Sequence, residues 1–303
     1  MIAPRLQKGD TIGVVAPSSK IEDKDLPAIE ASKQLLEQAG YQVRFAKHAL
    51  EQTDKVAIEP EKRAADIHEM FAAEEVKMVF FLTGGAVSNT VFSYLDYELI
   101  AHYPKIVCGF SDATSLLNML YEKTGLVTFH GPTFKSLTSW GSDYGFQEVQ
   151  RVLAQASPEM VLEKPYTVIQ EGCAQGILVG GNISLFSRMI TGAYAVDVTD
   201  KILFLEELGL ETPPEMVYNY LYNMKQNGVF KNIKGIWLGN YEHPSGVTLP
   251  QIVKEVLGEN IPYPIIHSNH FGHVVEQSVI PIGVMVTIDT KEEKMIRREK
   301  CVE

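Results

Sequence analysis

One serine in the N-terminal half stands where a nucleophile could stand. Ser111 lies in the sequence GFSDA at residues 109–113, between a short apolar run and a stretch with helical periodicity. A serine at such a strand-to-helix turn projects its hydroxyl from the end of the strand, as in a nucleophile elbow, although the usual glycine two residues later is Ala113 here. Serine is also a favoured N-cap residue. The spacing therefore fits both a nucleophile and a helix cap.

Paired glycines follow the preceding apolar run. Gly84 and Gly85 open the sequence GGAVSN, which continues to Ser88 and Asn89. Glycine lets backbone N–H groups approach a ligand closely, and such donors can stabilise a tetrahedral oxyanion. The alternative is a tight turn in which Ser88 or Asn89 caps a helix. The pattern is not GxGxxG, so we expect no dinucleotide site. We also expect that the protein needs no cofactor.

Carboxylates and histidines that could activate a serine occur in the C-terminal half. Glu206 and Glu207 end an apolar run, and the sequence HSNHFGH at 267–273 contains three histidines. A serine hydroxyl needs an imidazole to take its proton, and the imidazole needs a carboxylate to fix its tautomer. A metal-dependent hydrolase using His267, His270 and His273 is the rival interpretation, without support from an HExxH motif or a cysteine. We expect a structural role for His267 and leave His270 open.

The elements that must position these residues alternate between strands and helices. Apolar runs at 11–16, 41–46, 77–82 and 105–110 predict strands, and amphipathic stretches from Leu26, from Pro60 and after residue 110 predict helices. This alternation is typical of a parallel sheet with helices on both faces. Ligands bind such sheets at the carboxyl ends of the strands. The loops after Leu82 and Phe110 are therefore the expected site.

The fold class that we predict is α/β, with two domains. A Rossmann- or flavodoxin-like parallel-sheet domain is expected at 1–150, a linker at 151–172, and a smaller mixed α/β domain at 173–303. Further strands are predicted in the second domain at 176–179, 201–205, 235–238, 264–267 and 284–288, with helices from Ile183 and after Pro214. A chain of 303 residues is long enough for two such domains.

Composition narrows the range of partners. The formal charge of −11 argues against binding to nucleic acid, which depends on Lys and Arg. No run of 18 apolar residues occurs, so no membrane span is expected. The first ten residues lack the apolar core of a signal peptide, and the three cysteines form no CxxC pair. We therefore expect a cytoplasmic protein that acts on a small molecule, and a non-catalytic ligand-binding protein is a second alternative.

Several segments together resemble the S66 serine peptidases, the family of LD-carboxypeptidases and microcin C immunity proteins. The resemblance covers nearly the whole chain and rests on the order and spacing of these segments. They are KGDTIGVVAPS at 8–18, the Gly84-Gly85 turn, GFSDAT at 109–114, HGP at 130–132, GILVGGN at 176–182, ILFLEE at 202–207 and FGH at 271–273.

The resemblance implies a catalytic triad divided between the two domains. Ser111 falls on the position of the nucleophile, Glu206 on that of the orienting acid and His273 on that of the base. The backbone N–H groups of Gly85 and Asp112 fall on the oxyanion hole. Glu207 and His270 are the neighbours that could replace Glu206 and His273 in these roles.

The resemblance also implies two substrate classes and a homodimer. LD-carboxypeptidases release D-alanine from the murein tetrapeptide during cell-wall recycling, whereas the immunity proteins cut the amide of an acyl-sulfamoyl adenylate. Gly84, Ser88 and Asn89, the expected substrate-binding residues, resemble the immunity branch. The immunity proteins stack the nucleotide on a tryptophan of the C-terminal region, whereas the two tryptophans here are Trp140 and Trp237.

Overall fold

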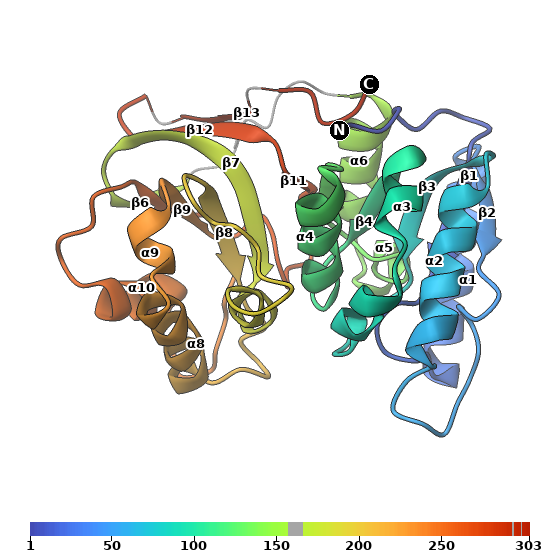
Figure 1. The fold of residues 1–303 in the computed structure, drawn as a ribbon, viewed down its shortest axis with the longest axis horizontal. Coiled ribbons are helices and arrows are strands. Elements are labelled where there is room, and N and C mark those ends of the chain that lie inside the picture. Colours follow the sequence, from blue (N-terminus) through green and yellow to red (C-terminus); the bar gives the residue numbers. More distant parts are fainter. Residues whose placement is uncertain (157–165, 293, 298) are drawn as a thin grey trace. The chain divides into compact units, whose positions relative to one another are not determined.

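The chain folds into two compact units, each built on one β-sheet. Figure 1 shows the computed structural model, which describes residues 1–156, 166–292, 294–297 and 299–303. The first unit comprises Met1–Ser157, Val275–Pro281 and Cys301–Glu303, and the second comprises Pro158–Val274 and Ile282–Lys300. No helix in the described ranges has the length and apolar character needed to cross a membrane.

The sheet of the first unit has six strands in the order β11-β5-β4-β3-β1-β2. Its strands are β1 (Thr11–Val15), β2 (Gln42–Phe45), β3 (Val76–Phe81), β4 (Ile106–Gly109), β5 (Thr128–His130) and β11 (Ile280–Ile282). The pairs from β2 to β5 are all parallel. The order 2-1-3-4-5 is that of flavodoxin-like folds, which confirms the predicted fold class.

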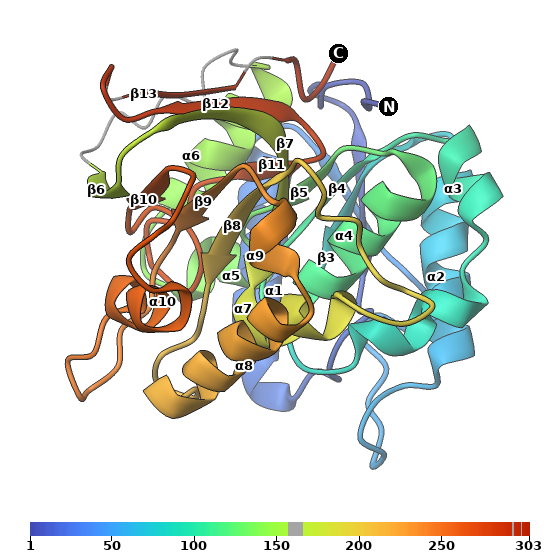
Figure 2. The same ribbon diagram turned by 60° about the vertical axis from the view of Figure 1, so that its left-hand side comes forward.

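Helices cover this sheet on both faces (Figure 2). They are α1 (Leu26–Gln38), α2 (Pro60–Ala72), α3 (Tyr97–His102), α4 (Ala113–Thr124), α5 (Ser136–Ser139) and α6 (Tyr144–Val149). Helix α1 contacts α5, whereas α2 contacts α3 and α3 contacts α4. Every residue of β1 is buried, as expected for a strand with a helical layer on each side. Gly13 of β1 lies close to Met70 of α2, where a side chain would collide.

The sheet of the second unit has seven strands in the order β13-β12-β7-β8-β9-β10-β6. Its strands are β6 (Thr167–Gln170), β7 (Cys173–Asn182), β8 (Ile202–Glu206), β9 (Gly235–Leu238), β10 (Ile265–His267), β12 (Met285–Asp289) and β13 (Lys294–Arg297). The central strands β7 to β10 run parallel, and β6, β12 and β13 are antiparallel to their neighbours. This mixture matches the mixed α/β architecture expected for the second half of the chain.

Among the residues that the structure describes, four α-helices accompany the second sheet. They are α7 (Ile183–Phe186), α8 (Pro214–Gln226), α9 (Val229–Asn232) and α10 (Leu249–Leu257). Helix α8 contacts each of the other three. Thr248 caps α10 through a reciprocal capping box with Gln251, which explains where this helix begins.

Two parts of the domain description differ from the sequence-based expectation. Strand β6 lies inside the stretch 151–172 that we expected to be a linker, and pairs with β10. Residues 275–281 and 301–303 group with the first unit, although 173–303 was expected to form the second domain. Part of the expected linker, 157–165, lies outside the described residues. The domain limits therefore stay a prediction.

Candidate active site

The turn that carries Ser111 is strained. Ser111 follows β4 and has a backbone φ of 60°, one of three positive φ values among the non-glycine residues that the structure describes. A left-handed conformation is costly for a residue with a Cβ, and such strain is concentrated at functional turns. The N-cap residue of α4 is Asp112, so the interpretation of Ser111 as a simple helix cap is wrong. The strained strand-to-helix turn is the feature that defines a nucleophile elbow.

The glycine turn after β3 lies against the Ser111 turn. A Cβ added at Gly84 would lie 3.0 Å from the Cβ of Ser111 and 3.2 Å from its Oγ. Gly85 has a φ of 145° and a side chain there would overlap Ser19, in the loop after β1. No side chain fits at Gly85, and one at Gly84 would press on Ser111. The backbone at 84–85 can therefore approach a group bound to Ser111.

Ser88 connects the glycine turn to the Ser111 turn through two hydrogen bonds to Asp112. The Ser88 N–H donates to the Asp112 carboxylate at 2.7 Å, and the Ser88 hydroxyl donates to the Asp112 carbonyl at 2.7 Å. Ser88 is fully buried, whereas Asn89 is exposed. The structure thus gives Ser88 a bracing role in the turn. The predicted contacts of Gly84, Ser88 and Asn89 with substrate stay predictions.

In the second unit, Glu206 and His273 form a hydrogen-bonded pair. Glu206 is the last residue of β8 and is fully buried, and His273 lies in the loop after β10. Oε2 of Glu206 lies 2.8 Å from the ring nitrogen Nδ1 of His273. The same oxygen accepts a hydrogen bond from the backbone N–H of His273 at 3.2 Å. Parallel strands β8, β9 and β10 end at the same edge, which is why residues 67 positions apart meet here.

Asn240, which the sequence analysis did not identify, supports this pair from the end of β9, the strand that lies between β8 and β10. Its side-chain amide donates to the His273 carbonyl at 2.9 Å, and its carbonyl accepts the Glu207 N–H at 3.1 Å. Asn240 follows β9 at the same edge of the sheet. Its position after a predicted strand was the available signal, and one asparagine in a loop is too common a feature to single out.

Charge and burial act in opposite directions on His273. Burial alone would lower the pKa of its imidazole, but the charge and the hydrogen bond of Glu206, with smaller contributions from Glu207 and Glu211, outweigh it. The net result is a pKa raised above the ordinary value. A carboxylate at Nδ1 also favours the tautomer with its proton there, so the lone pair lies on Nε2.

Gly272 makes the close approach of this pair possible. It has a φ of +96°, and a Cβ there would lie 2.7 Å from the Glu206 Cβ and 2.5 Å from its Oε2. We expect Gly272→Ala to displace His273 from the carboxylate and to lower kcat about 10²-fold, since small misplacements of catalytic groups have effects of that size. Steady-state kinetics measure the loss. Gly246→Ala, where a Cβ meets open space and φ is also positive, is the matched control and should keep kcat within about twofold.

Glu207 points elsewhere. Its carboxylate accepts hydrogen bonds from the Asn182 amide at 2.8 Å, from the N–H of Ser184 at 2.8 Å and from the N–H of Leu208 at 2.9 Å. Burial and the nearby charge of Glu206 raise its pKa. Glu207 thus ties the start of α7 to the end of β8, and Glu206 is the carboxylate that bonds to His273.

The three histidines of 267–273 do not form a common centre. In the part of the chain that the structure describes, no three His, Cys, Asp or Glu side chains converge as metal ligands would. His267 ends β10, and burial lowers its pKa. Of the three imidazoles, His273 is the one bonded to Glu206.

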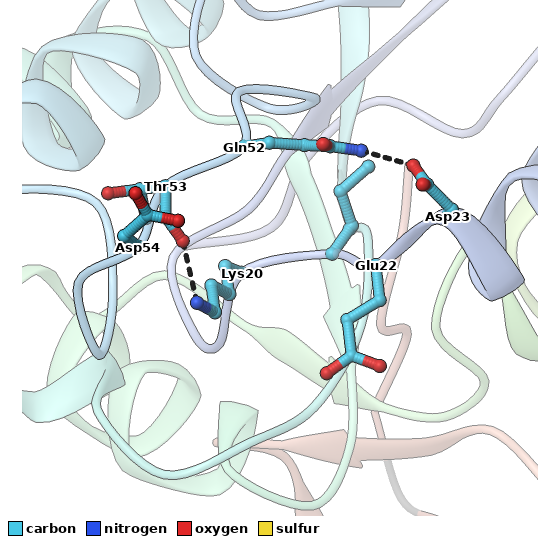
Figure 3. A pocket seen from close by; sticks show the side chains of 7 residues that line it. Lys20, Glu22, Asp23, Gln52, Thr53 and Asp54 are labelled. Atoms are coloured by element: carbon cyan, nitrogen blue, oxygen red, sulfur yellow. Dashed lines mark hydrogen bonds between the residues drawn. The ribbon is translucent and has the colours of Figure 1, made fainter.

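A polar pocket of about 390 Å³ opens in the first unit beside the loops after β1 and β2 (Figure 3). It is lined by Lys20, Ile21, Glu22, Asp23, Gln52, Thr53 and Asp54. The Lys20 ammonium donates to the Thr53 carbonyl at 2.6 Å, and the Gln52 amide donates to Asp23 at 2.6 Å. The two loops are thus bonded to each other at the sheet edge that also carries Ser111.

Two family models match the chain. The LD-carboxypeptidase N-terminal domain of peptidase family S66 matches residues 12–131, and the LD-carboxypeptidase C-terminal domain of that family matches residues 175–288. The first match contains Ser111 and both glycines of the 84–85 turn. The second contains Glu206 and His273.

Curated relatives and solved structures agree with these matches. A probable murein peptide carboxypeptidase of Bacillus subtilis is 30% identical over 96% of this chain and 92% of its own length. The microcin C7 self-immunity protein MccF of Escherichia coli is 25% identical over 95% and 93%. The crystal structure of an MccF-like protein from Bacillus anthracis is 31% identical, covers 99% of both chains and has a TM-score of 0.87. The chain therefore belongs to the S66 family of LD-carboxypeptidases, which confirms the family predicted from its sequence.

Proposed function

We propose that this S66 carboxypeptidase cleaves an amide bond with Ser111 as nucleophile, His273 as general base and Glu206 as the acid that orients the base. The observation that carries the proposal is the buried Glu206 carboxylate at 2.8 Å from Nδ1 of His273. A carboxylate in this position holds the imidazole in the tautomer whose Nε2 can accept a proton. The strained turn at Ser111 supports the choice of nucleophile.

The reaction follows from these roles. His273 Nε2 takes the proton from the Ser111 hydroxyl as the oxygen attacks the amide carbonyl, and the imidazolium then gives that proton to the leaving amine. Water, deprotonated by the same imidazole, hydrolyses the acyl-enzyme and regenerates the Ser111 hydroxyl. The charge of Glu206 stabilises the imidazolium in both steps.

The oxyanion of each tetrahedral intermediate needs donors near Ser111. We propose the backbone N–H groups of Gly85 and Asp112, which belong to the two turns packed against each other. Preorganised N–H donors of this kind are among the largest contributions to acyl transfer, and losing one costs about 10²- to 10³-fold in kcat.

The substrate that we propose is a murein tetrapeptide, from which the enzyme releases the terminal D-alanine. Support comes from the relative named as a probable murein peptide carboxypeptidase, which matches 96% of this chain. The cleaved amide then joins an L-centre to a D-centre. A small peptide substrate also agrees with the charge of −11, which makes a nucleic-acid substrate unfavourable.

An acyl-sulfamoyl adenylate is the second candidate substrate. It is favoured by the sequence Ser88-Asn89 after the glycines and by the 31% identity to an MccF-like protein. The tryptophans argue against it. Trp237 is fully buried in β9 with its indole N–H donating to Ser268 at 2.8 Å, and Trp140 packs edge-to-face on Phe110 at 5.4 Å.

The experiment that separates the two substrates uses both with the same enzyme. Murein tetrapeptide and a processed microcin C analogue are incubated separately with the wild type and with Ser111→Ala. The products are identified and quantified by mass spectrometry. We expect the wild type to release D-alanine at a kcat/KM at least about tenfold above that for the nucleotide substrate, a ratio worth about 1.4 kcal/mol. Preferential release of the adenylate would overturn the substrate assignment.

We also propose that the enzyme works in the cytoplasm as a homodimer on a small peptide. The three cysteines, all in the described ranges, form no disulfide, and Cys173 is exposed. Thiols of this kind suit a reducing compartment. The dimer rests on the family resemblance.

A further inference from the structure

Arg63 of α2 is buried and binds three different loops. Its side chain is only 4% exposed. The guanidinium donates to the carbonyls of Pro17, Ile58 at 2.8 Å and Val87 at 3.2 Å, and to the Thr90 hydroxyl at 2.6 Å. Pro17, Ile58 and Val87 belong to the loops that follow β1, β2 and β3. One side chain thus connects the loops at the carboxyl edge of three adjacent strands.

The loop that Arg63 holds is also bonded to the residue after the nucleophile. Val87 precedes Ser88, whose N–H and hydroxyl both donate to Asp112. The Asp112 side chain is itself 1% exposed. The guanidinium of Arg63 is therefore linked to the turn of Ser111 by its hydrogen bond to Val87, by the backbone from Val87 to Ser88, and by the hydrogen bonds of Ser88 to Asp112. The glycine turn at 84–85 lies between β3 and this braced segment.

The two buried charges also act on each other. Burial lowers the pKa of Arg63, and the negative charge of Asp112 opposes only part of that shift. Burial raises the pKa of Asp112 above its ordinary value and outweighs the hydrogen bonds of Ser88, which lower it. A buried carboxylate one residue from the nucleophile would oppose a developing oxyanion, because charges interact strongly away from water. A buried guanidinium nearby compensates that charge.

We propose that Arg63 is a positioning residue for the oxyanion hole: its hydrogen bonds to Val87 and Thr90 fix the 84–88 loop beside Ser111, and its positive charge offsets part of the negative charge of Asp112. The inference rests on the proposed function, since it needs an oxyanion at Ser111. Arg63 reaches the reaction through backbone that it holds and through charge, and it touches no substrate. A planar guanidinium suits this place because it donates in several fixed directions at once, which a lysine cannot do.

The test is a double-mutant cycle of Arg63→Met and Asp112→Asn. We expect Arg63→Met to lower kcat about 10- to 100-fold, less than the loss of a whole oxyanion donor, with KM changed less than about threefold. The double variant should lose less than the product of the two single losses, because removing the carboxylate relieves the charge that Arg63 compensated. Losses that multiply, with no coupling between the two positions, would overturn the electrostatic part of the proposal.

A second measurement separates positioning from folding. The dissociation constant of a peptide boronic acid, which forms a tetrahedral adduct with the serine, is compared with that of the same peptide ending in a carboxylate. Arg63→Met should weaken the boronate by the same factor as kcat/KM and leave the carboxylate peptide within about threefold. Equal weakening of both ligands, or of neither, contradicts the proposal. Arg63→Lys, which keeps the charge, should fall between wild type and Arg63→Met and serves if the methionine variant does not fold.

Controls distinguish this inference from the proposed function. Asp66→Asn removes another buried carboxylate of α2, one that bonds to His48 at 2.8 Å, and should leave both dissociation constants unchanged. If the wild type fails to bind the boronate more tightly than the carboxylate peptide, the serine mechanism itself is wrong. If the wild type shows that preference and Arg63→Met keeps it in full, only the role of Arg63 is wrong.

Discussion

We expect Ser111→Ala to lower kcat on the murein tetrapeptide, the proposed substrate, by about 10⁴-fold or more and to change KM little. The expected size follows from the loss of the attacking oxygen, which the other triad members cannot replace. The residual rate comes from the oxyanion donors and from substrate positioning. Single-turnover kinetics with mass detection of released D-alanine measure the effect. The acyl-enzyme that we expect to accumulate on the wild type should not form on this variant.

A neighbouring serine provides the control for this result. Ser115 lies on the same helix, α4, and is buried, so Ser115→Ala removes a hydroxyl from the same region of the fold. We expect it to keep kcat within about threefold, as for a side chain outside the reaction. A Ser111→Ala enzyme with activity near that of Ser115→Ala would rule out the nucleophile assignment.

Glu206→Gln is the substitution with the second largest expected effect. An amide lacks the negative charge that stabilises the imidazolium of His273, and its NH2 group can donate to Nδ1 and favour the wrong tautomer. The loss in a comparable triad is about 10⁴-fold in kcat. The pH profile should change as well. His273 must be neutral to act as a base, so activity rises with pH through its pKa, which Glu206 raises. Without that charge, burial lowers the pKa, and the acid limb of the profile moves to lower pH.

Glu207→Gln is the matched control for Glu206→Gln. Glu207 is the next residue and is also buried, but its carboxylate bonds to Asn182 and to backbone N–H groups at the start of α7. We expect a lower melting temperature, kcat within about tenfold of wild type and a smaller shift of the acid limb, because Glu207 makes only a minor contribution to the His273 pKa. A larger loss of kcat in Glu207→Gln than in Glu206→Gln would reverse the two assignments.

Hydrophobic patterning was enough to predict most of the fold. The strands that became β1, β3 and β4 are short apolar runs, because both faces of a parallel sheet are buried. The sequence did not reveal β5, β6, β11 or β13. The pairing of β6 with β10 depends on contacts with a segment far away in the sequence.

The candidate site was predicted in part. The sequence itself indicates a serine, a carboxylate and a histidine as candidates. The resemblance to the S66 family selected Glu206 rather than Glu207, and His273 rather than His270. The backbone conformation of Ser111 and the different partners of Glu206 and Glu207 depend on tertiary structure. Arg63 escaped notice because a charged residue on an amphipathic helix is normally exposed, whereas here it is buried among carbonyl groups.

The path of the chain through the two units limits how the enzyme can be dissected. Residues 275–281 return to the first unit after most of the second has been completed, and β11 covers the outer side of β5. Val302 also forms a bridge with Ala3, so the last residues pair with the first. A fragment ending near residue 156 would leave the unpaired backbone of β5 open to association with other chains. The half that carries the serine therefore takes part of its sheet from residues beyond 274, and we expect a fragment of residues 1–156 to associate with other chains rather than fold alone.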